Sequence, residues 1–277
     1  MLFPTIAAIT IIFLLIGSYT DIKTREVPDW LSYGLIFSAF AISAIFSLEL
    51  GWQLFLSSLL GFAVCFLIAL AFYYSHQWGG GDAKLLMGMG AVIGIAFPFS
   101  EQSFSLLFFF LALLFLGAIY GLLWMIVLAI LRKTFWAEFK AEIREQKKTH
   151  YVLLAATLIL LIPSIVYPLF LPLLVFPLGI FYLFIFVNLV ERNCFIKRIP
   201  VERLTPGDWL AEDVKLHGKV FMQKKTLDEK DLVKIKETAL KHVIIKEGVP
   251  FIPAFLLAYL LLIFGDNVWD WFYRLLF

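Results

Sequence analysis

Long apolar runs alternate with short polar segments along most of the chain. A helix that crosses a bilayer needs roughly 20 residues, and several of these runs are long enough. The expected spans are residues 2–19, 31–48, 54–74, 83–97, 104–131, two within 151–190, and 250–265. The pattern predicts an all-α polytopic membrane protein with about eight transmembrane helices, or six if residues 151–190 are re-entrant or lie flat.

The charged segments between these runs divide the chain into parts. The expected parts are a membrane core at 1–131, an amphipathic cytosolic linker at 132–150, a transmembrane hairpin at 151–190, a small cytosolic domain at 191–250, and a last transmembrane helix with its tail at 251–277. Three prolines, Pro163, Pro168 and Pro172, mark the turn of the hairpin, because proline interrupts helices.

The part at 191–250 differs from the rest in being rich in charge and alternating in pattern. Residues 220–223 and 242–246 alternate as strands do, and residues 228–241 carry apolar side chains near helical spacing. These features predict a small α+β domain inserted before the last helix.

Composition agrees with a membrane protein. Apolar residues make up 62% of the 277 and charged residues 16%, whereas soluble domains average nearly half and a quarter. The net charge of +2 comes from residues that form no extended basic patch, so nucleic acid is not an expected partner. The two cysteines, Cys65 and Cys194, fit neither a disulfide framework nor a paired zinc motif.

Positive charge predicts the orientation of the chain. In the eight-span arrangement every Lys and Arg except Arg274 falls on one face of the membrane. Basic residues in short loops stay in the cytoplasm, so this face is expected to be cytosolic. The sequence therefore predicts a multi-pass protein of the cell membrane.

Two aspartates stand at the ends of apolar runs. Asp82 follows three consecutive glycines and opens one run, and Asp21 closes the first run. An ionisable group in such a position is costly to desolvate and is a candidate functional residue. Two predicted spans separate the aspartates along the chain, so both should lie on the cytosolic side.

A pair of aspartates can hydrolyse a peptide bond. One ionised carboxylate takes a proton from water, while a protonated one polarises the carbonyl group; two carboxyl groups about 3 Å apart share a proton and titrate as a pair. Gly79, Gly80 and Gly81 would let a substrate backbone approach closely and leave room for water. If Asp82 caps its helix, the helix dipole favours its ionised form and makes it the base.

The same residues also have simpler interpretations. Asp82 can be a helix cap only, and Asp21 a helix terminator paired with Arg25. Lys84 is either an interfacial lysine that extends toward the headgroups or a contact of the site. The sequence has no HisGluXaaXaaHis motif, no clustered His and Cys and no GlyXaaSerXaaGly elbow, so we expect chemistry without a metal or other cofactor.

Two motifs give the sequence a family resemblance. The runs GlyGlyGlyAspAlaLysLeu at 79–85 and AspIleLysThrArgGluValProAsp at 21–29 resemble those of type IV prepilin peptidases and archaeal preflagellin peptidases, membrane aspartic proteases of the GxGD class. The resemblance covers the core at 1–131. The runs at 204–210 and 248–255 look like the carboxy-terminal extension of archaeal members.

The resemblance implies a function and a catalytic pair. It implies that Asp21 and Asp82 are catalytic, and that the protein cleaves the short basic leader from pilin-like or archaellin-like precursors at the cytosolic membrane face. The sequence lacks the paired CysXaaXaaCys insert of the bifunctional bacterial enzymes, so no methyltransferase activity is expected.

The substrate is expected to contact the glycines at 79–81, Lys84, and the acidic residues Glu26 and Asp29, which lie closest along the chain to Asp21. Alternatively, Glu26 and Asp29 pair with Lys23 and Arg25 in a solvated loop. Expected partners are the precursor proteins and the lipid bilayer, and the oligomeric state stays open.

Three other functions remain open at this point. The two aspartates occur in the GxGD class that also contains presenilin-like intramembrane proteases. They could instead bind cations in an ion or proton transporter, although such sites are commonly near the membrane midplane in broken helices. A catalytically inactive assembly scaffold is the third.

Overall fold

The computed structural model describes residues 2–75, 77–216, 219–238 and 240–276. They fold as two compact units, one formed by Met1–Gly121 with Gly248–Phe277 and the other by Leu122–Glu247. The first unit carries both candidate aspartates. The boundaries of the five expected parts stay predictions.

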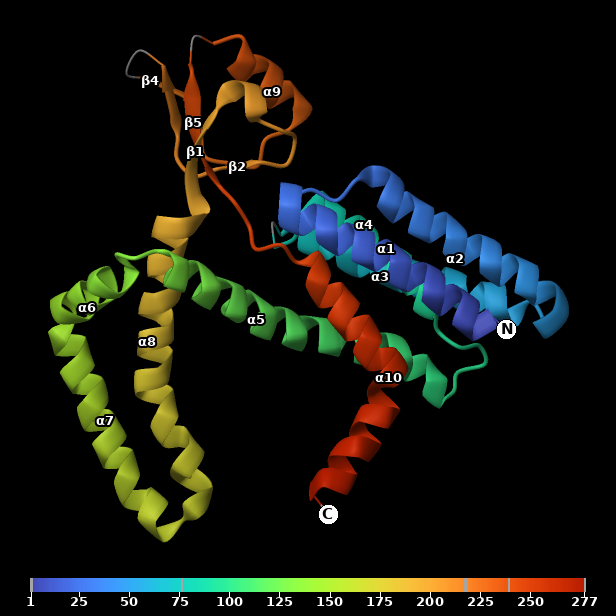
Figure 1. Cartoon of the computed structure of the whole chain (residues 1–277), viewed down its shortest axis with the longest axis horizontal. Helices are drawn as coiled ribbons and strands as arrows, with labels where there is room; N and C mark the ends of the chain where they lie inside the picture. Colours follow the sequence, from blue (N-terminus) through green and yellow to red (C-terminus); the bar gives the residue numbers. More distant parts are fainter. Residues whose placement is uncertain (1, 76, 217–218, 239, 277) are drawn as a thin grey trace. The chain divides into compact units, whose positions relative to one another are not determined.

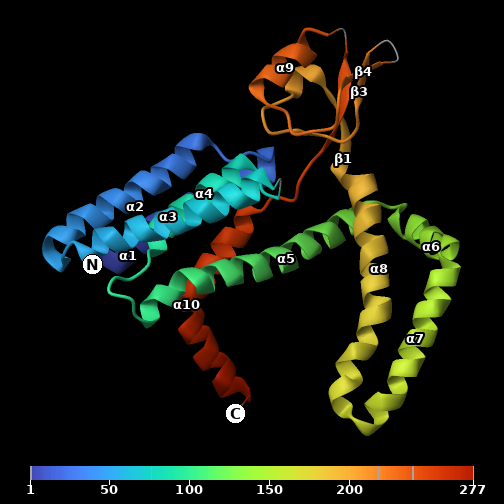
Figure 2. The ribbon, with the colours of Figure 1, turned by 180° about the vertical axis from the view of Figure 1, so that it is seen from behind.

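The first unit is a bundle of apolar helices (Figure 1). Its elements are α1 (Leu2–Thr24), α2 (Asp29–Leu50), α3 (Gln53–Tyr74), α4 (Gly80–Ile93), the short η1 (Glu101–Phe104), the first part of α5 (Ser105–Leu131), and α10 (Ile252–Leu276). In both Figure 1 and Figure 2, α1 to α4 lie side by side. The buried core of this unit consists mainly of Leu, Ala and Phe side chains from these helices.

Glycines allow α4 to pack unusually closely against α3. A Cβ atom built on Gly61 would lie 2.2 Å from the carbonyl oxygen of Gly90, and one built on Gly90 would lie 2.4 Å from that of Gly61. Ser58 adds a hydrogen bond between the helices, from its hydroxyl to the carbonyl of Ala91 at 2.6 Å. Small residues at a helix interface permit such an approach where two membrane helices meet.

The count of eight spans is not confirmed. Among the described residues, six helices are long and apolar enough to cross a membrane, by length and composition. Helix α4 is not one of them, because it has 14 residues and stops before Gly94, whose φ is 69°. It begins three residues before the expected start at 83 and ends four residues before 97. Helix α10 has 25 residues, and its apolar stretch among the described side chains is Ile252–Gly265.

The second unit contains a helical hairpin. Its helices are α6 (Phe135–Glu145), α7 (Lys147–Val166), η2 (Pro168–Leu174), α8 (Val175–Val190) and the π-helical η3 (Glu191–Phe195). Figure 2 shows α7 and α8 running antiparallel. Pro168 and Pro172 lie in η2, between the two helices, as predicted, whereas Pro163 lies inside α7 near its end. Both arms of the hairpin are among the six candidate spans.

The remainder of the second unit is a small α+β fold. Its elements are β1 (Ile196–Pro200), η4 (Val201–Arg203), β2 (Trp209–Leu210), β3 (Val214–Leu216), β4 (Lys219–Met222), α9 (Glu229–Lys236) and β5 (His242–Lys246). Antiparallel pairing gives a sheet of order β1-β5-β2 and a separate β3-β4 pair. The strand predicted at 242–246 is confirmed, and the one predicted at 220–223 is shifted by one residue.

Helix α9 is shorter than the predicted 228–241. Asp228 caps its start by accepting a hydrogen bond from the Asp231 amide at 2.7 Å, and Lys225 pairs with the Asp231 carboxylate at 2.7 Å. Desolvation raises the pKa of Asp231, but the hydrogen bonds from Lys225 and Asp228 outweigh it and hold that pKa below its ordinary value. The apolar side chains of Leu232 and Ile235 complete the core of the small fold.

The close contact between α3 and α4 predicts a clear difference between two glycine substitutions. Gly61→Ala should lower the melting temperature in detergent, because the new Cβ meets backbone and overpacking costs about 1–3 kcal/mol. Gly121→Ala in α5 is the control, since a Cβ there meets nothing within 4 Å and alanine favours the helix by about 0.8–1 kcal/mol. Equal melting temperatures for the two variants would contradict the packing described here.

Candidate active site

Asp21 lies in the last turn of α1 and is buried, with 7% of its surface exposed. The helix was expected to end before it, with a loop from residue 20 to 30. Instead, α1 continues to Thr24, and the side chain of Thr24 bonds the carbonyl of Thr20 at 2.8 Å. The helix stops at Arg25, which takes a positive φ of 61°. Asp21 is therefore held by regular helix and is not part of a loop.

Asp82 is the third residue of α4. The N-cap residue of this helix is Gly79, and Asp82 lies in its first turn. The backbone N–H of Gly79 donates a hydrogen bond to the Asp82 carboxylate. Part of the Asp82 surface is exposed to solvent and part is buried. A carboxylate in the first turn still gains from the helix dipole, by roughly 0.3–1 kcal/mol.

The two aspartates meet in the first unit. Their carboxyl groups are close enough to interact electrostatically, although 60 positions in the sequence separate Asp21 from Asp82. The structure thus brings together the two residues that the sequence singled out. Two carboxyl groups in this relation can act as an acid and a base on one bond.

Two further side chains act on Asp21. Arg25 interacts with its carboxylate, and Tyr120, half-buried on α5, interacts with both Asp21 and Arg25. The sequence analysis did not single out Tyr120. Its only signal was a phenolic hydroxyl inside a long apolar run, where such a group needs a polar partner.

The start of α10 also reaches the site. The backbone N–H of Ile252 donates a hydrogen bond of 2.9 Å to Oδ2 of Asp21. The ring of Trp78, directly before the glycine run, lies 5.5 Å from that of Phe251 and 5.9 Å from that of Phe255. The sequence did not predict these contacts, although residues 248–255 resemble a motif of archaeal members.

The glycine run has a tight contact at one position. A Cβ on Gly81 would lie 2.9 Å from Cβ of Val27, in the segment between α1 and α2. At Gly79 and Gly80 the nearest atoms would be 3.6 Å and 3.8 Å away, which is ordinary contact. Gly81 therefore lets α4 approach the segment that follows Asp21.

Lys84, Asp29 and Glu26 are not equivalent. Lys84 forms an ion pair with Asp29 at 2.5 Å and lies over the ring of Tyr33 at 5.3 Å. Asp29 thus has a partner on α4, which the sequence did not indicate. The ammonium of Lys23 bonds the Tyr19 hydroxyl at 3.3 Å, and Glu26 is exposed.

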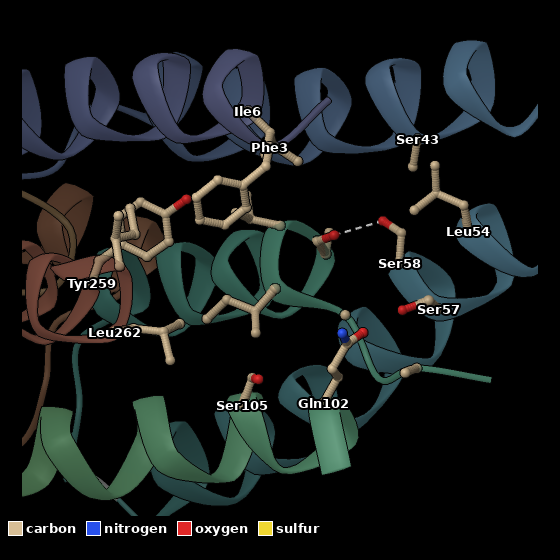
Figure 3. Close-up of a pocket in the computed structure, with 16 residues that line it drawn as sticks. Phe3, Ile6, Ser43, Leu54, Ser57, Ser58, Gln102, Ser105, Tyr259 and Leu262 are labelled. Carbon is tan, nitrogen blue, oxygen red and sulfur yellow. Dashed lines mark hydrogen bonds between the residues drawn. The ribbon is translucent and has the colours of Figure 1, made fainter. Parts of the chain in front are cut away.

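A cavity of about 430 Å³ lies in the first unit, and neither aspartate lines it (Figure 3). It is lined by residues 3 and 6 near the start of α1 and by 91–94 at the end of α4, which are the opposite ends from Asp21 and Asp82. Ser58, Gln102 and Tyr259 line it as well. We therefore place the candidate chemistry at the aspartates and not in this cavity.

Within the described residues, no group of three or more His, Cys, Asp or Glu side chains could hold a metal ion.

The fold and site define a mostly helical protein, with six described helices long and apolar enough to cross a membrane and a pair of interacting aspartates at helix ends. Residues 8–122, which include both aspartates, match the type IV leader peptidase family. The match covers less than half of the chain and agrees with the resemblance that the two motifs carry.

Part of the chain is also similar to curated preflagellin peptidases. The preflagellin peptidase of Methanococcus voltae is 39% identical over 93 residues, which are 33% of this chain and 40% of that protein. The preflagellin peptidase of Methanocaldococcus jannaschii is 39% identical over 85 residues, 29% of this chain and 34% of that protein. The preflagellin peptidase of Methanococcus maripaludis is 34% identical over 82 residues, which are 29% of this chain and 35% of that protein. The chain thus spans well under half the length of these relatives.

The contact between Gly81 and Val27 can be tested by a double-mutant cycle. Gly81→Ala should lower the free energy of unfolding in detergent, and the loss should be smaller in a Val27→Gly background, where the opposing Cβ is absent. For residues in contact, a coupling of about 0.5–3 kcal/mol is expected. If the effects of Gly81→Ala and Val27→Gly on the free energy of unfolding are additive, Gly81 and Val27 are not in the contact described here.

Proposed function

We propose that the protein is a membrane aspartic endopeptidase. It removes the short basic leader from archaellin-like or type IV pilin-like precursors, at the cytosolic face of the cell membrane. The observation that carries the proposal is the interaction between Asp21 and Asp82, two carboxyl groups on different helices within the family-matched residues. The names of the preflagellin peptidase relatives support the substrate class.

The proposed reaction uses both carboxyl groups and one water molecule. The ionised aspartate removes a proton from water as its oxygen attacks the scissile carbonyl carbon, and the protonated aspartate donates a hydrogen bond to the carbonyl oxygen. The tetrahedral intermediate then collapses, the carbon–nitrogen bond breaks, and the leaving amine takes the proton that the first aspartate had removed from water, which restores the starting state of the pair. No covalent intermediate with the enzyme is needed.

The position of the aspartates suits a substrate that lies partly in the membrane. Asp21 is in the last turn of α1 and Asp82 in the first turn of α4, so both are at helix ends. A precursor whose hydrophobic helix stays in lipid would present its scissile bond at this level. Transporters commonly bind ions near the midplane, so the positions favour the peptidase over the transporter alternative.

Lys23, Arg25 and Lys84 lie near the aspartates along the chain, which supports a cytosolic position for the site. The same distribution of charge supports the cell membrane as the location.

Glu26 is the acidic residue that we assign to the leader. It is exposed, whereas the charge of Asp29 is already balanced by Lys84 at 2.5 Å. A lysine or arginine of the leader can therefore pair with Glu26. Asp29 and Lys84 instead tie the start of α2 to α4, the helix that carries Asp82.

The first prediction from this proposal concerns the pair itself. Asp21→Asn and Asp82→Asn should each reduce precursor cleavage by about a thousandfold or more, because neither amide can transfer the proton. Cleavage is measured by the mobility shift of a precursor incubated with membranes. Glu101→Gln, at the exposed start of η1, is the matched control for loss of a carboxylate.

Both aspartate variants should remain as abundant in the membrane as the wild-type protein. A chelator should leave cleavage by the wild type unchanged. Retained cleavage in either single variant would remove the two-aspartate mechanism.

The second prediction separates Glu26 from Asp29. Glu26→Gln should raise KM for a basic leader about two- to fivefold, the effect of an exposed pair worth up to about 1 kcal/mol, with little change in kcat. For a leader whose lysines are replaced by glutamine, the same variant should behave as the wild type. Asp29→Asn should change KM equally for both leaders, because Asp29 pairs with Lys84 and not with the leader. Equal KM increases for both leaders with Glu26→Gln would exclude charge recognition by this residue.

A further inference from the structure

The first turn of α10 contacts both segments that carry the aspartates. The amide of Ile252 donates to Asp21 at 2.9 Å, across 231 positions in the sequence. On the other side, Trp78 packs against Phe251 and Phe255 and stacks on Phe72 with ring centres 4.7 Å apart. This turn therefore lies between α1 and the glycine run.

The hydrogen bond to Asp21 follows from the position of Ile252 in its helix. Ile252 is the first residue of α10, and the first N–H groups of a helix have no acceptor within it. The carboxylate of Asp21 supplies that acceptor, and the backbone N–H of Phe251 acts on the same carboxylate. The positive end of the α10 dipole also faces a negative charge there.

The packing around this turn leaves it little freedom. Ile252 and Phe255 are fully buried, and Pro253 and Ala254 between them are buried as well. A Cβ on Gly17, one turn before Asp21, would lie 3.2 Å from the Ile252 side chain. A Cβ on Gly117 of α5 would lie 2.5 Å from the ring of Phe251. The donor is thus fixed in place relative to the helix that carries its acceptor.

We propose that the first turn of α10 positions the Asp21 carboxylate for catalysis, and that Ile252 is the positioning residue through its backbone N–H. The bond from Ile252 is made to one carboxylate oxygen, Oδ2, and so orients the carboxyl group. The active site would then include a segment outside the family-matched residues 8–122. This inference rests on the proposed peptidase function.

A matched pair of substitutions isolates the N–H group. Ile252→Pro and Ile252→Ala both remove the branched side chain, but only proline removes the donor. Proline is well tolerated at the first position of a helix, and Phe251 before it is already outside the helix. Relative to Ile252→Ala, Ile252→Pro should lower kcat about 10- to 100-fold and leave KM within about twofold. Ile252→Val should restore nearly wild-type kcat.

A second variant decides the question if Ile252→Pro fails to fold. Replacing Ile252 by its α-hydroxy acid during cell-free synthesis changes the amide to an ester, which deletes the N–H and keeps the side chain. The same fall in kcat is expected.

A chemical readout makes the test independent of proteolysis. Labelling of Asp21 by a hydrophobic carbodiimide is measured by mass spectrometry, and this reagent reacts with a protonated carboxyl group. The N–H donor of Ile252 stabilises the charged carboxylate, so its removal favours the protonated form. Labelling should therefore be several-fold faster in the variants without the donor than in Ile252→Ala.

The outcomes separate the two proposals. If the wild type cleaves precursors but Ile252→Pro matches Ile252→Ala in kcat and in labelling, α10 only packs on the core and the positioning role is overturned. If the wild type cleaves no precursor while labelling still differs as expected, the peptidase function fails and the contact between Ile252 and Asp21 stands.

Discussion

Two carboxyl groups placed together at the ends of apolar helices lose solvation and repel each other, and the rest of the first unit compensates for this. A buried charge is tolerated only when hydrogen-bond donors and opposite charges surround it. Asp21 has the amide of Ile252, the nearby Arg25 and the interaction with Tyr120. Asp82 has the amide of Gly79 and the amino-terminal end of α4. The amino-terminal end of a helix therefore stabilises each carboxylate, that of α10 for Asp21 and that of α4 for Asp82.

Bringing these donors together requires helices that approach closely. The contacts of Gly61 with Gly90 set α4 directly against α3, and Gly81 lets α4 approach the segment after Asp21. The ion pair between Lys84 and Asp29 then fixes α4 to the start of α2. The glycines before Asp82 thus have a packing role in addition to the space that they leave for a substrate. Packing and chemistry are consequently coupled in this short helix.

Much of this arrangement could be predicted from the sequence, because it depends on side-chain type and on the period of the apolar runs. The convergence of Asp21 and Asp82 followed from two spans between them, and the strand at 242–246 followed from alternation. The contact of Ile252 could not be predicted, because a backbone N–H has no signature in side-chain type and its partner is 231 positions away. Likewise, the sequence offered several cations near Asp29, and only the packing of α4 selects Lys84. The expected bounds of the fourth span were too far along the chain, because nothing in the apolar pattern indicates that the helix ends before Gly94 after 14 residues.

The measurement that tests the central claim most directly is photo-crosslinking of a bound precursor. An archaellin-like precursor with benzoylphenylalanine next to the scissile bond would be bound to the Asp82→Asn protein and irradiated, and the attachment sites mapped by mass spectrometry. Our account predicts attachment within residues 17–25, 78–85 and 250–255, around the two aspartates. Attachment instead within 91–105, beside the cavity at the other end of α4, would contradict it.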